Sequence, residues 1–132
     1  MTKPIQVKNI SLGEGLPKIC VPLTGKTEEE IKEEGKKAVE AGAELVEWRA
    51  DFFEALENRE SLEKMLFSLS DILGQVPLLF TIRTSKEGGN REIRTKDYVN
   101  YNMWACETGK ADFIDVEASG DEALKKELIR RL

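Results

Sequence analysis

Charged residues spaced two positions apart close three apolar segments of this chain. They stand in the runs Glu47-Trp48-Arg49-Ala50-Asp51, Thr81-Ile82-Arg83 and Asp115-Val116-Glu117. In a β-strand, residues two apart point to the same face, so the charges of each run share one side of a sheet. Apolar residues precede each run, so the charges lie at the carboxyl ends of the strands, where α/β proteins place their ligand sites. Carboxylates and guanidinium groups gathered at such a rim can bind a ligand that carries several hydroxyl groups.

A structural ion network is the competing interpretation of the same charges. Such a network costs desolvation but is stable when each charge has a partner. Spacing alone does not separate the two interpretations, since both place charged groups in perturbing surroundings. The residues concerned are Glu47, Arg49, Asp51, Arg83 and Glu117.

Strand and helix patterns alternate along the chain. Residues 1–16, with Ile5 to Ile10 at their centre, predict a short β-hairpin, and residues 17–132 predict four βα units in the same single domain. Threonine caps and acidic first turns mark the helix starts, and glycines mark the ends. The expected strands are 18–23, 44–51, 77–83 and 111–117; the expected helices are 28–41 after a Thr27 cap, 59–73, a third one capped by Thr95 and ending near 108, and one from about 121.

Four successive βα units imply an α/β fold with a parallel sheet and right-handed crossovers. Two architectures fit this pattern: a small doubly wound sheet, and half of a TIM (β/α)8 barrel. Central strands of a doubly wound sheet are apolar on both faces, whereas barrel strands can aim polar groups into the mouth of the barrel. The three charges on one face of residues 44–51 favour the half-barrel.

Composition narrows the class of protein. At 132 residues with 40% hydrophobic content, the chain fits one globular domain with one core. Its net charge is -5 and its basic residues are scattered, which argues against a nucleic-acid partner. No apolar run approaches the ~20 residues needed to span a bilayer, and residues 1–4 lack the apolar stretch of a secretory signal. We therefore expect a cytoplasmic protein without a membrane partner.

Few residues suggest metal or cofactor chemistry. The chain contains no histidine, which removes imidazole as a base or ligand. Cys20 and Cys106 lack metal-ligand spacing, and we expect both to be small core residues. Gly88-Gly89 lacks phosphate-binding spacing and instead indicates a polar loop over 84–90, a candidate lid. We expect no metal and no cofactor.

No lysine stands out as a nucleophile for imine formation, which requires an amine that is neutral near pH 7. Lys86 lies in the polar loop, where we expect it to be solvated. Lys18 and Lys110 stand at the entrance of strands, at the end of the sheet opposite the charged rim.

Whole segments of the chain resemble the type I 3-dehydroquinate dehydratases, in the order and at the spacing of that family. The matching segments are Gly13-Glu14-Gly15 with Pro17-Lys18-Ile19, Glu47-Trp48-Arg49-Ala50-Asp51-Phe52-Phe53, Pro77-Leu78-Leu79-Phe80-Thr81-Ile82-Arg83-Thr84 with Glu87-Gly88-Gly89, and Asp112-Phe113-Ile114-Asp115-Val116-Glu117. The resemblance covers nearly the whole chain, to about residue 122.

The resemblance implies a TIM barrel lyase of the shikimate pathway and aromatic amino acid biosynthesis. In that family a lysine forms a Schiff base with 3-dehydroquinate, and a histidine moves protons while water is lost to give 3-dehydroshikimate. By position, Glu47, Arg49 and Arg83 are implied to bind the substrate, and Glu87 is implied to assist the catalytic histidine. Asp51 and Glu117 are then expected to hold the arginines in place. One departure is Pro22, which replaces a small hydroxyl residue of the family.

The family's catalytic histidine and lysine lie on later strands than those of this chain, which ends at Leu132. We therefore expect the amino-terminal half of such an enzyme, able to bind substrate but inactive alone. The alternative is a non-catalytic half-barrel scaffold that associates with itself. Either way, open strand edges and an uncovered interior face predict a homo-oligomer or association with the missing carboxyl-terminal half.

Overall fold

A computed structural model of the chain describes residues 5–7, 10–12, 19–83 and 93–115. The first two segments are the strands β1 (Ile5–Val7) and β2 (Ile10–Leu12), which pair antiparallel as the predicted hairpin. Glu87, Glu117, Lys18, Lys86, the polar loop over 84–90 and the expected last helix lie outside the described residues.

The main sheet has four strands in the order β3-β4-β5-β6, and each neighbouring pair is parallel. Its strands are β3 (Cys20–Leu23), β4 (Leu45–Arg49), β5 (Leu78–Thr81) and β6 (Phe113–Ile114). Because the four strands all run parallel, their carboxyl ends lie at one rim of the sheet.

Three helices alternate with these strands in the described chain: α1 (Glu28–Glu40), α2 (Arg59–Leu73) and α3 (Thr95–Thr108). The Thr27 hydroxyl accepts a hydrogen bond from the Glu30 amide, which confirms the predicted cap of α1. The predicted Thr95 cap is wrong by one residue. Arg94 occupies the cap position without a capping side-chain bond, and Thr95 is the first helical residue.

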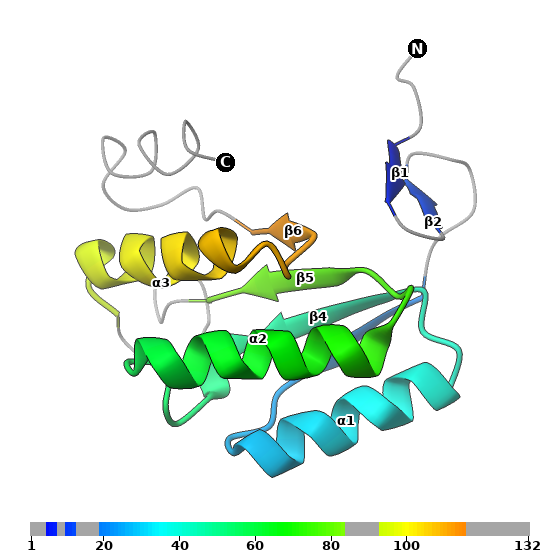
Figure 1. The fold of residues 1–132 in the computed structure, drawn as a ribbon, viewed down its shortest axis with the longest axis horizontal. Helices are drawn as coiled ribbons and strands as arrows, with labels where there is room; N and C mark the ends of the chain where they lie inside the picture. Colours follow the sequence, from blue (N-terminus) through cyan, green and yellow to red (C-terminus); the bar gives the residue numbers. More distant parts are fainter. Residues whose placement is uncertain (1–4, 8–9, 13–18, 84–92, 116–132) are drawn as a thin grey trace.

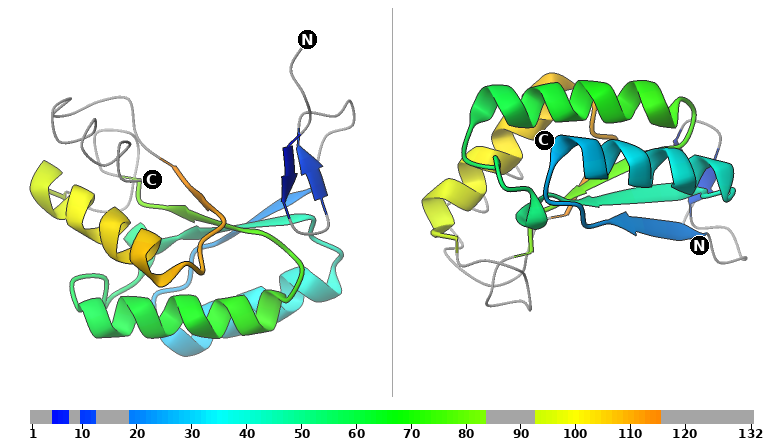
Figure 2. Two further views of the ribbon diagram at one scale, coloured as in Figure 1. Left: turned by 45° about the horizontal axis from the view of Figure 1, so that its top comes forward. Right: turned by 90° about the horizontal axis from the view of Figure 1, so that it is seen from below.

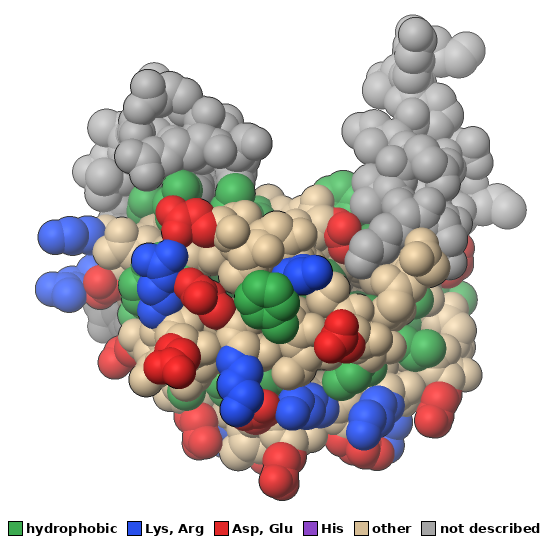
Figure 3. Space-filling view, in the orientation of Figure 1, with side chains coloured by type: hydrophobic (Ala, Val, Ile, Leu, Met, Phe, Trp, Pro, Cys, Tyr) green, Lys and Arg blue, Asp and Glu red, His purple; other side chains and the backbone are tan. Residues whose placement is uncertain are grey.

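All three helices lie on the same side of the main sheet (Figures 1 and 2). The core forms between them, because the strands present buried side chains to that side at alternate positions. Trp48 is fully buried there, with its ring 5.6 Å from that of Phe53 and 5.5 Å from that of Phe80. A doubly wound sheet would carry helices on both faces, so the described elements match the half-barrel. On the outer side of the helices, acidic and basic side chains are interspersed (Figure 3).

The face of the sheet turned away from the helices is organised in layers by the strand register. One layer aligns Pro22, Glu47, Leu79 and Phe113 across the four strands. Nearer the rim, Arg49 aligns with Thr81. Apart from Glu47, this face is therefore apolar toward the amino ends of the strands, and it is polar toward their carboxyl ends.

Cys20 corrects one expectation from the sequence. It was expected in the core, but it is exposed, and Cys106 is only partly buried. Cys20 aligns with Leu45 on the face without helices, and its strand β3 is an edge of the described sheet. An apolar strand sequence does not reveal which of its two faces is covered.

Within the described segments, none of the helices combines the length and apolar character needed to cross a membrane.

Candidate active site

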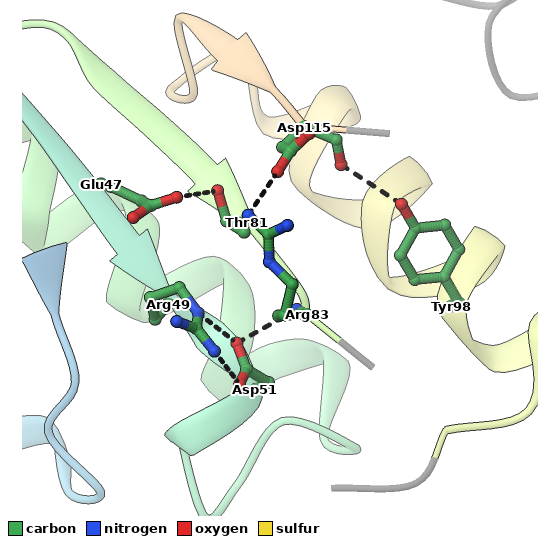
Figure 4. Close-up of polar contacts among 7 residues, drawn as sticks. All are labelled: Glu47, Arg49, Asp51, Thr81, Arg83, Tyr98 and Asp115. Carbon is green, nitrogen blue, oxygen red and sulfur yellow. Dashed lines mark hydrogen bonds and ion pairs between the residues drawn. The ribbon is translucent and has the colours of Figure 1, made fainter. Parts of the chain in front are cut away.

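A cluster of polar side chains occupies the rim formed by the carboxyl ends of β4, β5 and β6 (Figure 4). Glu47 and Arg49 come from β4, Thr81 ends β5, and Arg83 follows it by two residues. Asp115 directly follows β6. The register of the parallel strands thus brings together residues that are more than thirty positions apart in sequence, as in the contact of Thr81 with Glu47 at a separation of 34.

Asp51 is fully buried and binds both arginines of the cluster. Its carboxylate accepts bonds from Nε and Nη2 of Arg49 at 3.0 and 2.9 Å, and from the backbone amide of Arg83 at 3.2 Å. The paired geometry is the strong, planar form of an arginine–carboxylate contact. These hydrogen bonds raise the pKa of Arg49 above its ordinary value, so its guanidinium stays charged at every working pH.

The position of Asp51 corrects a detail of the predicted strand. Strand β4 ends at Arg49, and a single 3-10 turn, η1 (Ala50–Phe52), follows. The turn carries the Asp51 carboxylate back beneath the Arg49 guanidinium instead of extending it along the strand. The same turn places the ring of Phe52 5.1 Å from the centre of the Arg49 guanidinium, a cation–π contact.

Arg83 has a second carboxylate partner at the other side of the rim. Its Nη2 donates to Oδ2 of Asp115 at 3.1 Å, and both side chains keep 35% of their surface exposed. The hydroxyl of Tyr98, a residue of α3 that is 2% exposed, donates to the backbone oxygen of Asp115 at 3.2 Å. Helix α3 therefore supports the arginine through the end of β6.

Glu47 is held by a neutral group. The hydroxyl of Thr81 donates to Oε2 of Glu47 at 2.9 Å, and Glu47 is partly exposed on the helix-free face. The carboxylate also acts at a distance on the neighbouring edge strand. Desolvation in the first place, and the negative charge of Glu47 in the second, raise the pKa of the Cys20 thiol.

The structure brings together four of the six residues singled out in the sequence: Glu47, Arg49, Asp51 and Arg83. The other two, Glu87 and Glu117, lie outside the described residues. Three contributing groups were assigned no role from the sequence: Thr81 and Asp115, which stand in the runs described there, and Tyr98. The sequence could have indicated the first two, because each stands two positions before a selected residue and would share its face of an extended strand. The contribution of Tyr98 had no local signal.

The arginines of this rim form ion pairs and are also partly exposed. Arg49 and Arg83 each form an ion pair, as the structural interpretation requires. Neither guanidinium is fully enclosed, however, since the side chains remain 20% and 35% exposed. Among the described residues, no group of three or more histidines, cysteines or acidic residues is arranged to hold a metal ion.

The sequence was compared with protein families and with proteins of known function. The family profile described as type I 3-dehydroquinase matches residues 19–132. The chain belongs to this family. A 3-dehydroquinate dehydratase of Clostridium botulinum is 43% identical over 129 residues, which are 98% of this chain and 51% of that protein. A second 3-dehydroquinate dehydratase, from Clostridioides difficile, is 43% identical over 125 residues and is matched over 49% of its length. The chain thus spans about half the length of these relatives.

Solved structures give the same result for the fold. A type I 3-dehydroquinate dehydratase from Clostridium difficile, determined with covalent modified comenic acid, matches with a TM-score of 0.93 and 40% identity over 98% of this chain and 51% of its own. The enzyme from Enterococcus faecalis matches with a TM-score of 0.91 and 34% identity, over 96% of this chain and 53% of its own. A deoxyribose-phosphate aldolase from Toxoplasma gondii, at 18% identity and a TM-score of 0.62, shares the fold alone. The half-barrel prediction is confirmed.

Replacing Asp51 by asparagine tests the central contact of the rim. Asp51→Asn keeps the shape of the side chain but turns an amide toward the Arg49 guanidinium and leaves that charge without its partner. We expect the free energy of unfolding in urea to fall by about 2–3 kcal/mol. Asp71→Asn, at an exposed position of α2, is the matched control and should change it by less than about 0.5 kcal/mol. Equal effects of the two substitutions would contradict a structural role for Asp51.

Proposed function

We propose that this chain forms the substrate-binding half of a 3-dehydroquinate dehydratase site, with 3-dehydroquinate as its ligand. The observation that carries the proposal is the convergence of Glu47, Arg49 and Arg83 at one rim of a sheet whose family is established. The proposal includes a cytoplasmic location, since the ligand is a biosynthetic intermediate.

The chemistry of the rim suits a small ligand with a carboxylate and several hydroxyl groups. A guanidinium has five N–H donors. Asp51 receives two of those of Arg49, and Asp115 receives one of those of Arg83, so further donors remain for ligand oxygens. Glu47, in contrast to the positively charged donors of the arginines, supplies a negatively charged acceptor for a ligand hydroxyl. Donors and an acceptor at one edge can fix both the position and the orientation of a ring.

The reacting groups must come from elsewhere. Dehydration through an imine needs an amine that attacks the ketone and a group that moves protons. This chain has no histidine, and Lys110 lies before β6 with its ammonium group 5.5 Å from the centre of the Phe67 ring, at the opposite end of the strands. In the proposal, the part of the barrel that the relatives have and this chain does not span supplies the lysine and the histidine. The chain alone then binds the ligand weakly and does not convert it.

Binding by the isolated chain gives the direct test. Titration with 3-dehydroquinate, followed by NMR, should shift the signals of the rim residues of β4 and β5. Glu47→Gln keeps the side-chain shape but removes the charged acceptor, and we expect it to weaken binding about tenfold. Glu57→Gln, at an exposed position before α2, is the matched control and should bind as the unchanged chain does. Equal affinities of the two variants would contradict the assignment of Glu47.

A trapping experiment tests the expected absence of imine chemistry. Incubation of the chain with 3-dehydroquinate and borohydride should leave its intact mass unchanged. A lysine that formed an imine would lose water in that step and gain two hydrogens on reduction, so a trapped adduct would add the mass of the ligand less one water plus two hydrogens. The full-length Clostridioides difficile relative serves as the positive control. A stable adduct on this chain, located to any lysine by peptide mapping, would show that the chain carries its own nucleophile.

Self-association without catalysis is the second candidate function, and the uncovered sheet face favours it. Leu45, Leu79 and Phe113 lie on this face and are only partly buried. In the described sheet, β3 and β6 are edge strands whose outer sides are unpaired. Apolar surface and open strand edges of this kind promote association between chains.

The oligomeric state tests this candidate. If copies associate through the uncovered face, light scattering should show a dimer or larger assembly that buries about 1,500 Å² or more. Leu79→Arg should then dissociate it, since the new charge would lie inside the contact. Phe67→Arg, at an α2 position that is 47% exposed on the helical side, is the matched control and should leave it intact. A monomer at micromolar concentration, or an assembly that persists in Leu79→Arg, would exclude this mode of association.

A further inference from the structure

Thr81 is a buried hydroxyl residue beside the ligand-binding rim. Its side chain is fully buried at the end of β5, and its hydroxyl donates to Oε2 of Glu47 at 2.9 Å. A carboxylate at neutral pH has acceptors only, so the single hydroxyl proton of Thr81 lies on this bond. A β-branched side chain in a closed environment also has few rotamers. Thr81 is therefore a fixed donor.

The register of the strands shows the direction in which this donor acts. Glu47 aligns with Leu79, whereas Thr81 aligns with Arg49, one layer nearer the rim. The hydrogen bond therefore runs diagonally across β4 and β5 and draws the carboxylate of Glu47 toward the level of the arginines (Figure 4). Without this bond, the long and partly exposed side chain of Glu47 could adopt several rotamers.

We propose that Thr81 is a positioning residue that orients the Glu47 carboxylate for the ligand. The bond occupies Oε2 and leaves Oε1 to accept a hydrogen bond from a ligand hydroxyl. The ligand part of this inference rests on the proposed function; the orientation of Glu47 by Thr81 does not. Ordering the acceptor before the ligand arrives removes an entropy cost from binding.

The kind of partner distinguishes Glu47 from the other carboxylates of the rim. Asp51 and Asp115 each form an ion pair with an arginine. The hydrogen bond of Thr81 to Glu47 comes from a neutral group, which orients the carboxylate without neutralising it. A charged acceptor therefore remains for the ligand. A lysine or arginine at position 81 would have neutralised the charge of Glu47.

Side-chain couplings measured by NMR on the isolated chain test the orientation directly. In the unchanged chain, the couplings about χ1 and χ2 of Glu47 should indicate one rotamer. Thr81→Val keeps the branched shape without the hydroxyl, and the couplings should become averaged. Thr81→Ser restores the hydroxyl and should restore the single rotamer. A purely structural role would change stability in both variants but would not produce this pattern in the couplings of Glu47.

Two outcomes would overturn the inference. One is averaged couplings of Glu47 in the unchanged chain, which decide the question even if Thr81→Val does not fold. The other is an unaltered Glu47 rotamer in a folded Thr81→Val variant. Binding of 3-dehydroquinate supplies a separate result, with about fivefold weaker affinity expected for Thr81→Val and less than twofold change for Thr81→Ser. If Glu47→Gln binds normally while Thr81 still orders Glu47, the proposed function fails and the positioning role stands.

Discussion

The buried carboxylate of Asp51 ties the ends of two strands into one site. It binds the guanidinium of Arg49, at the end of β4, and the backbone amide of Arg83, beyond the end of β5. A carboxylate removed from water is costly unless its oxygens receive hydrogen bonds, and here both do. The positions of the two arginines are consequently linked through the Asp51 carboxylate. A displacement of either strand end would leave Asp51 partly unsatisfied, so the rim and the sheet stabilise one another.

The rest of the fold serves to keep those strand ends in register. Helices α1, α2 and α3 cover one side of the sheet, and the fully buried Trp48 and Phe80 fix neighbouring strands against them. Burial of large apolar side chains is the main favourable contribution to folding in such a core. Because side chains alternate between faces, the same strands that bury Trp48 must present Glu47 and Arg49 on the other side. The geometry of the site is thus a direct product of the packing behind it.

Much of this arrangement is predictable from particular residues. The alternation within residues 44–51 places Glu47 and Arg49 on one face, and the stop at Gly74 and the cap at Thr27 delimit helices that the structure confirms. The hydroxyl of Thr81 was overlooked because threonine in a strand is read first as a good strand former. The contact of Tyr98 with Asp115 spans 17 residues and joins a helix to a strand end, which no local pattern encodes. Cys20 was misplaced because burial depends on what covers a face, and a strand sequence does not specify that.

The ion pairs of the rim are formed entirely within the part of the barrel that this chain provides. Arg49 finds Asp51 two residues away, and Arg83 finds Asp115 on the adjacent strand. The carboxylates that pair with these guanidinium groups thus come from the residues that directly follow β4 and β6. Whatever closes the open side of the sheet therefore meets two arginines that already have carboxylate partners.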